Sequence, residues 1–478
     1  MQHHFPIVLV GNALSLMVAA TRLAQQGADV ALVNDGKNWG GHFATVTFKG
    51  IPFDPGMVVY EFTSYNAGRG DEDPRTYDPS IRNDAGRFSK AVHDYIDTYQ
   101  ITHDIATPQM CVDGTVFDDI LIGNALSVLR QLPFAKQLES DLVAIQNRAF
   151  ASPFHASHKH QGDDFKKLSY QTVSLANHGV TFHSRLIEPF CRKLLNVPTS
   201  DVVALYHRVA WLPLFYPETL LSYLQGPPQA LPPTVFGYPV GECVGDLANK
   251  LRTEIENCER IRIIHERPVK VSVTDNGTLE LEFGNQDKIS AGRMAWANSL
   301  SELLRLLGRE QYVATYQKCS IVLAFLRIPT AALKLDFTIL SVVDPEVVTY
   351  RITNRTRCAR IESAFTDVVV EFNPDYAAAG GESLSQPAVI ERVGEDLLAL
   401  GIVTDTSQIE CLELRRMNNA LMLPSDANSI GFAQEMNGAV AAAPALFLLG
   451  PASGFFSSSL NDQVVQGLKL AALWGPPA

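Results

Sequence analysis

Residues 6–42 read PIVLVGNALSLMVAATRLAQQGADVALVNDGKNWGGH, and this stretch decides the fold. Residues 7–10 are an apolar run of strand length, and apolar residues recur at helical spacing between residues 14 and 25. A second apolar run follows Gly27 at residues 30–33. A strand, a helix and a strand of these lengths predict a right-handed crossover that joins two parallel strands.

Gly11 stands where the first predicted strand turns into the helix. At this position, backbone N–H groups and the helix dipole can hold a dinucleotide pyrophosphate. The glycine pattern GxGxxG is incomplete, because its three positions carry Gly11, Ala13 and Leu16. The end of the second strand, where an acidic residue would bind ribose, carries Asn34 followed by Asp35. This stretch alone is therefore a weak indication of a dinucleotide site.

Composition limits the possible classes of protein. The chain has 478 residues, enough for two or three domains that share one large core. Its net charge of −12 argues against a nucleic-acid partner and an anionic membrane surface. No membrane-spanning window or signal peptide is expected, and the seven cysteines lack metal-like spacing. We therefore expect a cytoplasmic protein with a small-molecule substrate, as a monomer or as a homo- or hetero-oligomer.

The rest of the chain predicts helices and strands that build two sheets. The predicted helices cover residues 87–99, 117–131, 135–148, most of 168–225, 241–257, 299–308, 388–400 and 461–473. The predicted strands cover residues 44–48, 261–265, 268–273, 279–283, 294–297, 411–415, 445–450 and several runs between 317 and 372. Residues 64–86 predict a polar surface loop that could close over a site, and the proline-rich residues 226–239 predict a linker.

Four blocks of the chain resemble the flavin-dependent amine oxidase superfamily, which includes protoporphyrinogen oxidase, phytoene desaturase-like enzymes and UDP-galactopyranose mutase. They are residues 11–42, GIPFDPG at 50–56, PVKV at 268–271, and LFLLG at 446–450 with NDQVVQGLKLA at 461–471. PFCRKLLNVPTSDV (189–202) and the pair TYRIT (349–353) and VEFNP (370–374) are similar to the mutase branch. An arginine that the mutases use near the substrate diphosphate falls at Leu212, although Arg208 is retained, which argues against a strict mutase.

The resemblance implies an α/β fold in which a Rossmann-like FAD-binding domain is interleaved with a mixed or antiparallel-sheet substrate domain and a helical region. Residues 1–62, 240–310 and 405–478 would form the FAD-binding domain, 63–239 the helical region and 311–404 the substrate domain. The implied function is FAD-dependent oxidation of a small, anionic substrate. Two alternatives stay open: a flavin-dependent sugar-nucleotide mutase-like enzyme, and a non-catalytic binding protein or subunit, similar to the GDP-dissociation inhibitors, with a lapsed FAD site.

The resemblance also assigns residues to the cofactor. The implied cofactor-binding residues are Gly11, Ala13, Leu14, Asn34, Asp35, Gly40, Gly41, His42, Gly56, Met57, Val269, Gly450, Asp462, Gln463 and Val464.

Three of these assignments have alternatives. Asn34 keeps a hydrogen-bonding side chain but loses the charge, and Asp35 either replaces that charge or caps the following turn. Asp462 begins the last predicted helix, where it acts as a cap, and the N–H groups of Gln463 and Val464 would also face the flavin. Pro451 follows Gly450 where the family has an acidic residue, and it offers neither an acceptor side chain nor an N–H group.

Basic residues supply the catalytic candidates. Arg351 on a predicted strand would bind an anionic group of the substrate, whereas its neighbours at 355, 357 and 360 fit surface ion pairs. Lys193 and Arg208 are weaker candidates, because a side chain that extends from an apolar helix to solvent also explains them. A histidine cluster at 155, 158 and 160 fits a solvated loop better than a metal site.

Overall fold

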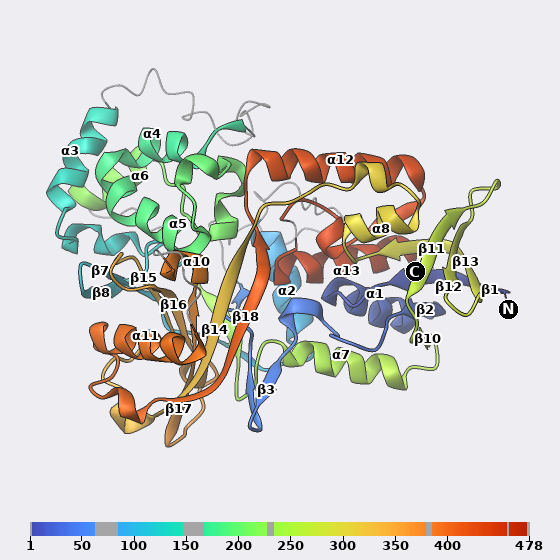
Figure 1. The fold of residues 1–478 in the computed structure, drawn as a ribbon, viewed down its shortest axis with the longest axis horizontal. Helices are drawn as coiled ribbons and strands as arrows, with labels where there is room; N and C mark the ends of the chain where they lie inside the picture. Colours follow the sequence, from blue (N-terminus) through green and yellow to red (C-terminus); the bar gives the residue numbers. More distant parts are fainter. Residues whose placement is uncertain are drawn as a thin grey trace.

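The computed structural model describes residues 2–62, 85–146, 167–226, 234–378, 385–456 and 458–475. Two sheet-containing parts lie side by side (Figure 1). One part holds the first and last elements of the chain, and the other is crossed by the long strands β14 (Lys318–Pro329) and β18 (Glu410–Met422), which run through the middle of the view. Most of the predicted surface loop at 64–86 and the three clustered histidines lie outside the described residues.

The first sheet is built around β1 (Gln2–Val10). β1 pairs in parallel with β2 (Val30–Val33) and with β13 (Lys288–Trp296), so the predicted parallel pair is confirmed. Residues 7–10 and all of β2 are buried, which explains why both runs are continuously apolar. The remaining strands of this sheet are β10 (Ile261–Ile264), β11 (Pro268–Val273), β12 (Leu279–Phe283) and β19 (Leu446–Leu448). The predicted hairpin is the antiparallel pair β11–β12.

Helices from both ends of the chain pack on this sheet. α1 (Leu14–Gln25) lies against α13 (Leu460–Trp474), the predicted closing helix. The two helices come close because Gly467 has no side chain: an added Cβ would lie 2.5 Å from the Ser15 carbonyl oxygen. α7 (Asp246–Asn257), α8 (Leu300–Leu306) and α12 (Asp426–Ala442) complete this part of the molecule (Figure 1).

The second sheet has the order β18-β14-β17-β16-β15-β7-β8. Its other members are β17 (Phe365–Phe372), β16 (Thr349–Asn354), β15 (Ile339–Val342), β7 (Gln109–Val112) and β8 (Thr115–Asp118). All pairs are antiparallel except β15–β7, so the sheet is mixed and the predicted fold class is confirmed. β18, β7 and β8 come from outside residues 311–404, and the domain boundaries stay a prediction.

Helices cover the region between β8 and β9. They are α3 (Ala135–Gln146), α4 (Tyr170–Phe182), a π-helical turn (His183–Ile187), α5 (Glu188–Leu195) and α6 (Pro217–Gln225), whereas α2 (Ala85–Ile96) comes earlier in the chain. Shorter elements of the chain are β3 (Val46–Phe48), β4 (Ile51–Phe53), β5 (Tyr60–Glu61), β6 (Thr102–Asp104), β9 (Phe236–Pro239), α9 (Arg355–Cys358), α10 (Pro374–Ala377) and α11 (Gln386–Ala399). None of the described helices is long and apolar enough to cross a membrane.

Two predicted elements are wrong. The helix expected at 117–131 is absent: β8 ends at Asp118 by pairing with β7, and residues 126–131 form a separate 3₁₀ helix. The linker expected at 226–239 ends in β9, which pairs with both β5 and β6. In both cases strand pairing overrides the local pattern: β8 pairs with its hairpin neighbour β7, and β9 pairs with strands distant in sequence.

Candidate functional site

The candidate site lies at the carboxyl ends of β1, β2, β13 and β19. β1 has β2 on one side and β13 on the other, so this edge is the switch point at which α/β sheets bind ligands. Gly11 leaves β1 with φ of 132°, and an added Cβ would lie 2.7 Å from Asn298 Oδ1. Gly40 has φ of 84°, and its added Cβ would lie 2.5 Å from the Ala248 Cβ. Only glycine fits at either position.

The structure brings several predicted cofactor residues together at this edge. The Gly40 N–H donates to the Asn12 carbonyl oxygen at 2.9 Å, and Gly40 forms a parallel bridge with Ala13. Gly450 follows β19 with φ of 54°, and an added Cβ would lie 3.3 Å from the Ala13 Cβ. Leu14 is buried as the first residue of α1. The backbone segments around Ala13, Gly40 and Gly450 therefore converge on the beginning of α1.

The N-terminus of α1 is buried, and among the described residues its N–H groups bond only to neutral oxygens, as the Leu16 N–H does to the Ala13 carbonyl oxygen at 3.0 Å. Ala13 provides no side-chain cap, and the first turn holds no acidic residue. The Ser15 N–H donates to Gln463 Oε1 at 3.3 Å, and the fully buried Ser15 Oγ finds no hydrogen-bond partner among the described residues. A buried helix N-terminus without an anion, beside an orphaned hydroxyl, fits a phosphate group.

A second buried polar group without a hydrogen-bond partner among the described residues lies at the end of β2. Asn34 Oδ1 accepts the Gly36 N–H at 2.8 Å, but its buried Nδ2 has no partner within the described ranges. Asp35 caps the turn through the Lys37 N–H at 3.0 Å and pairs with Arg267 at 2.6 Å. Of the two alternatives for Asp35, turn capping is therefore the one observed. Asn34 Nδ2 therefore remains as a donor, and a ribose hydroxyl oxygen could accept a hydrogen bond from it.

Open space lies beside the predicted contact at Gly41. Its φ is 63°, and an added Cβ would meet no atom within 4 Å. His42 is exposed and packs on Phe43 with ring centroids 3.9 Å apart, while Val269 on β11 is 56% exposed. No described side chain therefore blocks the backbone at Gly41 from a ligand.

Polar groups at the beginning of α13 form hydrogen bonds with one another. Asp462 Oδ2 accepts the N–H and the Oγ of Ser459, so it forms a capping box as expected for a first-turn acid. The Gln463 N–H donates to the Ser459 carbonyl oxygen at 3.0 Å, and Val464 is buried. The Gln463 N–H thus belongs to the helix hydrogen bonds, and the contact of Gln463 and Val464 with a flavin stays a prediction. Pro451 is exposed.

Gly56 and Met57 meet the second sheet at Glu371. The Met57 N–H donates to Glu371 Oε1 at 2.9 Å, and Tyr350 Oη donates to Oε2 at 3.1 Å. Arg351 binds the same carboxylate through Nε at 2.8 Å and Nη2 at 2.6 Å. An added Cβ on Gly56 would lie 3.3 Å from this carboxylate. Glu371 therefore joins the predicted cofactor loop to the predicted catalytic arginine.

This contact corrects the role expected for Arg351. Both side chains are buried, and the bidentate pair neutralises the guanidinium that was to hold an anionic substrate group. Glu371 was not among the sequence candidates. Glu371 belongs to VEFNP (370–374), a stretch that the resemblance to the mutase branch already included. Its pairing with Arg351 depends on the register between β16 and β17, which the sequence does not show.

A buried polar strip continues from Arg351 across the sheet. Ser341 on β15 stands directly opposite Arg351, and burial raises the pKa of Asp119, which faces Ser341, to about 6. Ser341 lies within hydrogen-bonding reach of the Asp119 carboxylate, whereas Arg351 Nη1 has no hydrogen-bond partner in the part of the chain that the structure describes. A buried donor without a partner, beside this polar pair, marks a place for water or a polar ligand group.

The other catalytic candidates have structural partners. The buried Lys193 Nζ donates to the carbonyl oxygens of Val342 at 2.9 Å and Asp344 at 3.0 Å, and burial lowers its pKa to about 7. It thus ties α5 to the end of β15. Arg208 lies over the Trp211 ring and 3.8 Å from Glu61. Leu212 is fully buried, so it adds no polar group to a site.

A second polar cluster crosses the helical region. The Phe215 N–H donates to His178 Nε2 at 2.9 Å, so the proton of neutral His178 is on Nδ1 and points to Ser174 Oγ at 3.0 Å. The Ser174 hydroxyl can then donate to His183 Nδ1 at 3.0 Å. One backbone N–H group thereby sets the tautomer of both histidines.

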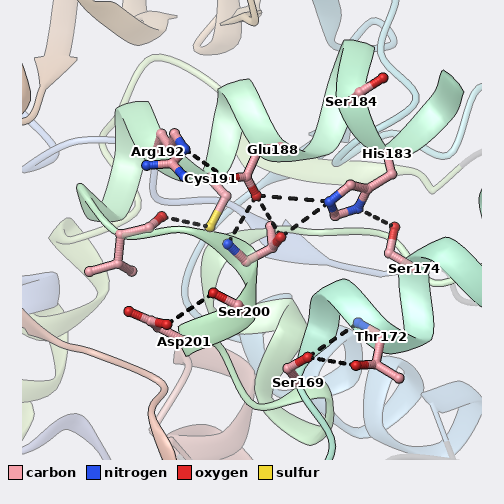
Figure 2. A network of polar contacts seen from close by, with 12 residues as sticks. Ser169, Thr172, Ser174, His183, Ser184, Glu188, Cys191, Arg192, Ser200 and Asp201 are labelled. Atoms are coloured by element: carbon pink, nitrogen blue, oxygen red, sulfur yellow. Dashed lines mark hydrogen bonds and ion pairs between the residues drawn. The ribbon is translucent and has the colours of Figure 1, made fainter. Parts of the chain in front are cut away.

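Figure 2 shows how this cluster continues from Ser174 and His183 to Glu188 and Arg192. His183 Nε2 lies 3.3 Å from Thr199 Oγ1, and the Thr199 hydroxyl donates to Glu188 Oε2 at 2.5 Å. Glu188 also accepts from Arg192 Nε at 2.6 Å. Each hydrogen bond of the cluster is therefore donated in the direction of the Glu188 carboxylate, which is paired with Arg192. This pattern holds His178 and His183 in the neutral form.

No protein-family model and no curated protein sequence matches this chain. Solved structures do match in fold. A reduced UDP-galactopyranose mutase is 14% identical, with a TM-score of 0.69 over 98% of this chain and 94% of that one. Cyclohexylamine oxidase from Brevibacterium oxydans is 14% identical, with a TM-score of 0.59 over 98% of both chains. Putrescine oxidase bound to putrescine is 11% identical, with a TM-score of 0.58 over 99% of both chains. The predicted resemblance is confirmed at the level of fold.

Proposed function

We propose that this chain, which has the fold of the mutase and amine oxidase structures, is an FAD-dependent oxidoreductase of a small molecule. The observation that carries the proposal is the buried, uncapped N-terminus of α1 with the orphaned Ser15 hydroxyl. An anionic phosphate would satisfy both groups, and the switch point of the sheet supplies the crevice. A flavin would supply the chemistry of hydride acceptance.

The residues have separate tasks in this proposal. The α1 N-terminus and Ser15 would hold the pyrophosphate, and Asn34 Nδ2 would donate to the ribose. Glu371 fixes the Met57 N–H and the Arg351 guanidinium in one orientation. Burial raises the pKa of Asp119 to about 6, so this carboxyl group takes up a proton only in slightly acidic solution and is mostly ionised at pH 7. Arg351 Nη1 remains free to orient a neutral acceptor group. An anionic substrate is no longer proposed, because Glu371 neutralises Arg351.

The direct test is an absorbance spectrum of the purified chain, followed by thermal unfolding with and without FAD. Flavin absorbance, or stabilisation by about 2.7 kcal/mol at 100 times the dissociation constant, is the expected result. A colourless protein whose unfolding midpoint does not respond to FAD would refute the proposal.

Gly41→Asn tests the predicted path of the cofactor. The substitution should weaken FAD binding at least about 10-fold, or about 1.4 kcal/mol, because its side chain would enter the open space beside the backbone. Gly50→Asn is the matched control: Gly50 has φ of 81°, and its added Cβ also meets no atom within 4 Å. Asparagine tolerates this backbone region, so both variants should fold. Equal FAD affinity in the two variants would contradict the placement.

A non-catalytic binding protein on the same fold is the second candidate. It is favoured by Pro451, which stands where the family has an acidic residue and has no N–H group. Absence of an FAD response together with a copurifying partner chain would support this alternative. A mutase-like activity has less support, because the position of the diphosphate-binding arginine is the buried Leu212.

A further inference from the structure

We propose that Gln463 and Gln466 are placeholders for a diphosphate: their side-chain carbonyl oxygens occupy N–H groups of the crevice until the ligand displaces them. This inference rests on the proposed function, because it concerns the same crevice. Its ligand class is a diphosphate-containing nucleotide.

The two glutamines reach the crevice from one face of α13. Gln463 Oε1 accepts the Ser15 N–H at 3.3 Å, and Gln466 Oε1 accepts the Gly450 N–H at 2.7 Å. Both side chains are at most 4% exposed. The two N–H groups belong to neighbouring backbone, since an added Cβ on Gly450 would lie 3.4 Å from Ser15 Oγ.

The hydrogen bonds at this point leave one buried hydroxyl group without a partner in the described part of the chain. Ser15 Oγ is fully buried and has no partner among the described residues, although it faces Gly450. The Gln463 contact at 3.3 Å is longer than a typical N–H···O bond. A neutral amide oxygen is also a weaker acceptor than a phosphate oxygen, and more so at a positively polarised helix end. A diphosphate would therefore replace both glutamines favourably and supply the acceptor that Ser15 lacks.

Displacement has a thermodynamic signature that an ordinary binding residue lacks. The glutamine contacts stabilise the ligand-free chain, and ligand binding must break them. Removing such a contact should therefore lower the stability of the free chain and tighten ligand binding together. A glutamine that only supports the fold would lower stability without tightening binding. A glutamine that contacts the ligand would weaken binding when removed.

The experiment compares Gln463→Met with the wild-type chain, both freed of any copurifying flavin. Methionine keeps the length and bulk of the side chain but not the strong acceptor. We expect the unfolding midpoint without ligand to fall by about 1–2 °C. The dissociation constants for ADP and FAD, measured by titration calorimetry, should fall about 2- to 10-fold. Gln434→Met at an exposed position of α12 is the matched control and should change neither quantity.

Each outcome decides between the two proposals. Weaker or unchanged ADP binding in Gln463→Met overturns the placeholder, and FAD binding by the wild type would still support the flavin function. Tighter ADP binding without any FAD binding supports the placeholder and overturns the flavin. ADP and FAD binding to neither chain overturns both. If Gln463→Met does not fold, Gln466→Met tests the same opposite changes at the Gly450 N–H.

Discussion

Replacing Glu371 by glutamine is expected to destabilise the fold by about 3–5 kcal/mol, the usual cost of removing one partner of a buried ion pair. Four donors converge on this carboxylate: the Met57 N–H, Tyr350 Oη, and Nε and Nη2 of Arg351. Glutamine keeps one acceptor oxygen, but its NH₂ group would face other donors. The Arg351 charge would also remain buried without its counter-ion.

Urea unfolding of Glu371→Gln and of the double variant Arg351→Met, Glu371→Leu would measure this effect. The double variant removes both charges and should recover most of the loss. Asp29→Asn is the control, because the Asp29–Arg260 pair is exposed and should contribute less than about 1 kcal/mol. A loss in Glu371→Gln no larger than in this control would show that the pair does not hold the second sheet to the Gly56–Met57 loop.

Acid should unfold this protein early, because His178 resists protonation in the folded state. Burial lowers its pKa from 6.5 to about 3, and a protonated Nε2 would confront the Phe215 N–H. Below pH 6.5 the unfolded chain therefore binds a proton that the folded chain does not. Stability is fully present above this pH and is lost as pH falls toward 3. His178 alone should account for a loss of about 3 kcal/mol between pH 7 and pH 4.

His178→Gln isolates this contribution, since the glutamine oxygen can still accept the Phe215 N–H while the side chain no longer titrates. The free energy of unfolding, measured in urea at several pH values, should depend on pH less steeply in the variant, by about 1.4 kcal/mol per pH unit. His265→Gln removes an exposed histidine and should leave the slope unchanged. Parallel curves for wild type and His178→Gln would mean that His178 is protonated in the folded protein.

The sequence was most informative where the signal is local. The apolar runs at 7–10 and 30–33 predict buried parallel strands, because both faces of such strands are covered. The turn at 275–277 predicts the β11–β12 hairpin. Asp462 was predicted as a first-turn cap, and Ser459 completes the capping box three residues before it. In each case the residues that cause the structure are neighbours in the chain.

The sequence by itself therefore determined the fold class and the strand–helix–strand unit at which the candidate site lies. Only the tertiary structure decided which groups meet there. Arg351 is neutralised by Glu371 through strand register, and Gln463 reaches Ser15 across 448 positions of the chain. Periodicity reports which face of an element is buried, but it carries no information on the partner that covers that face. A pairing across strands or helices is set by the packing of the whole chain, and so are the charge and hydrogen bonds of the site.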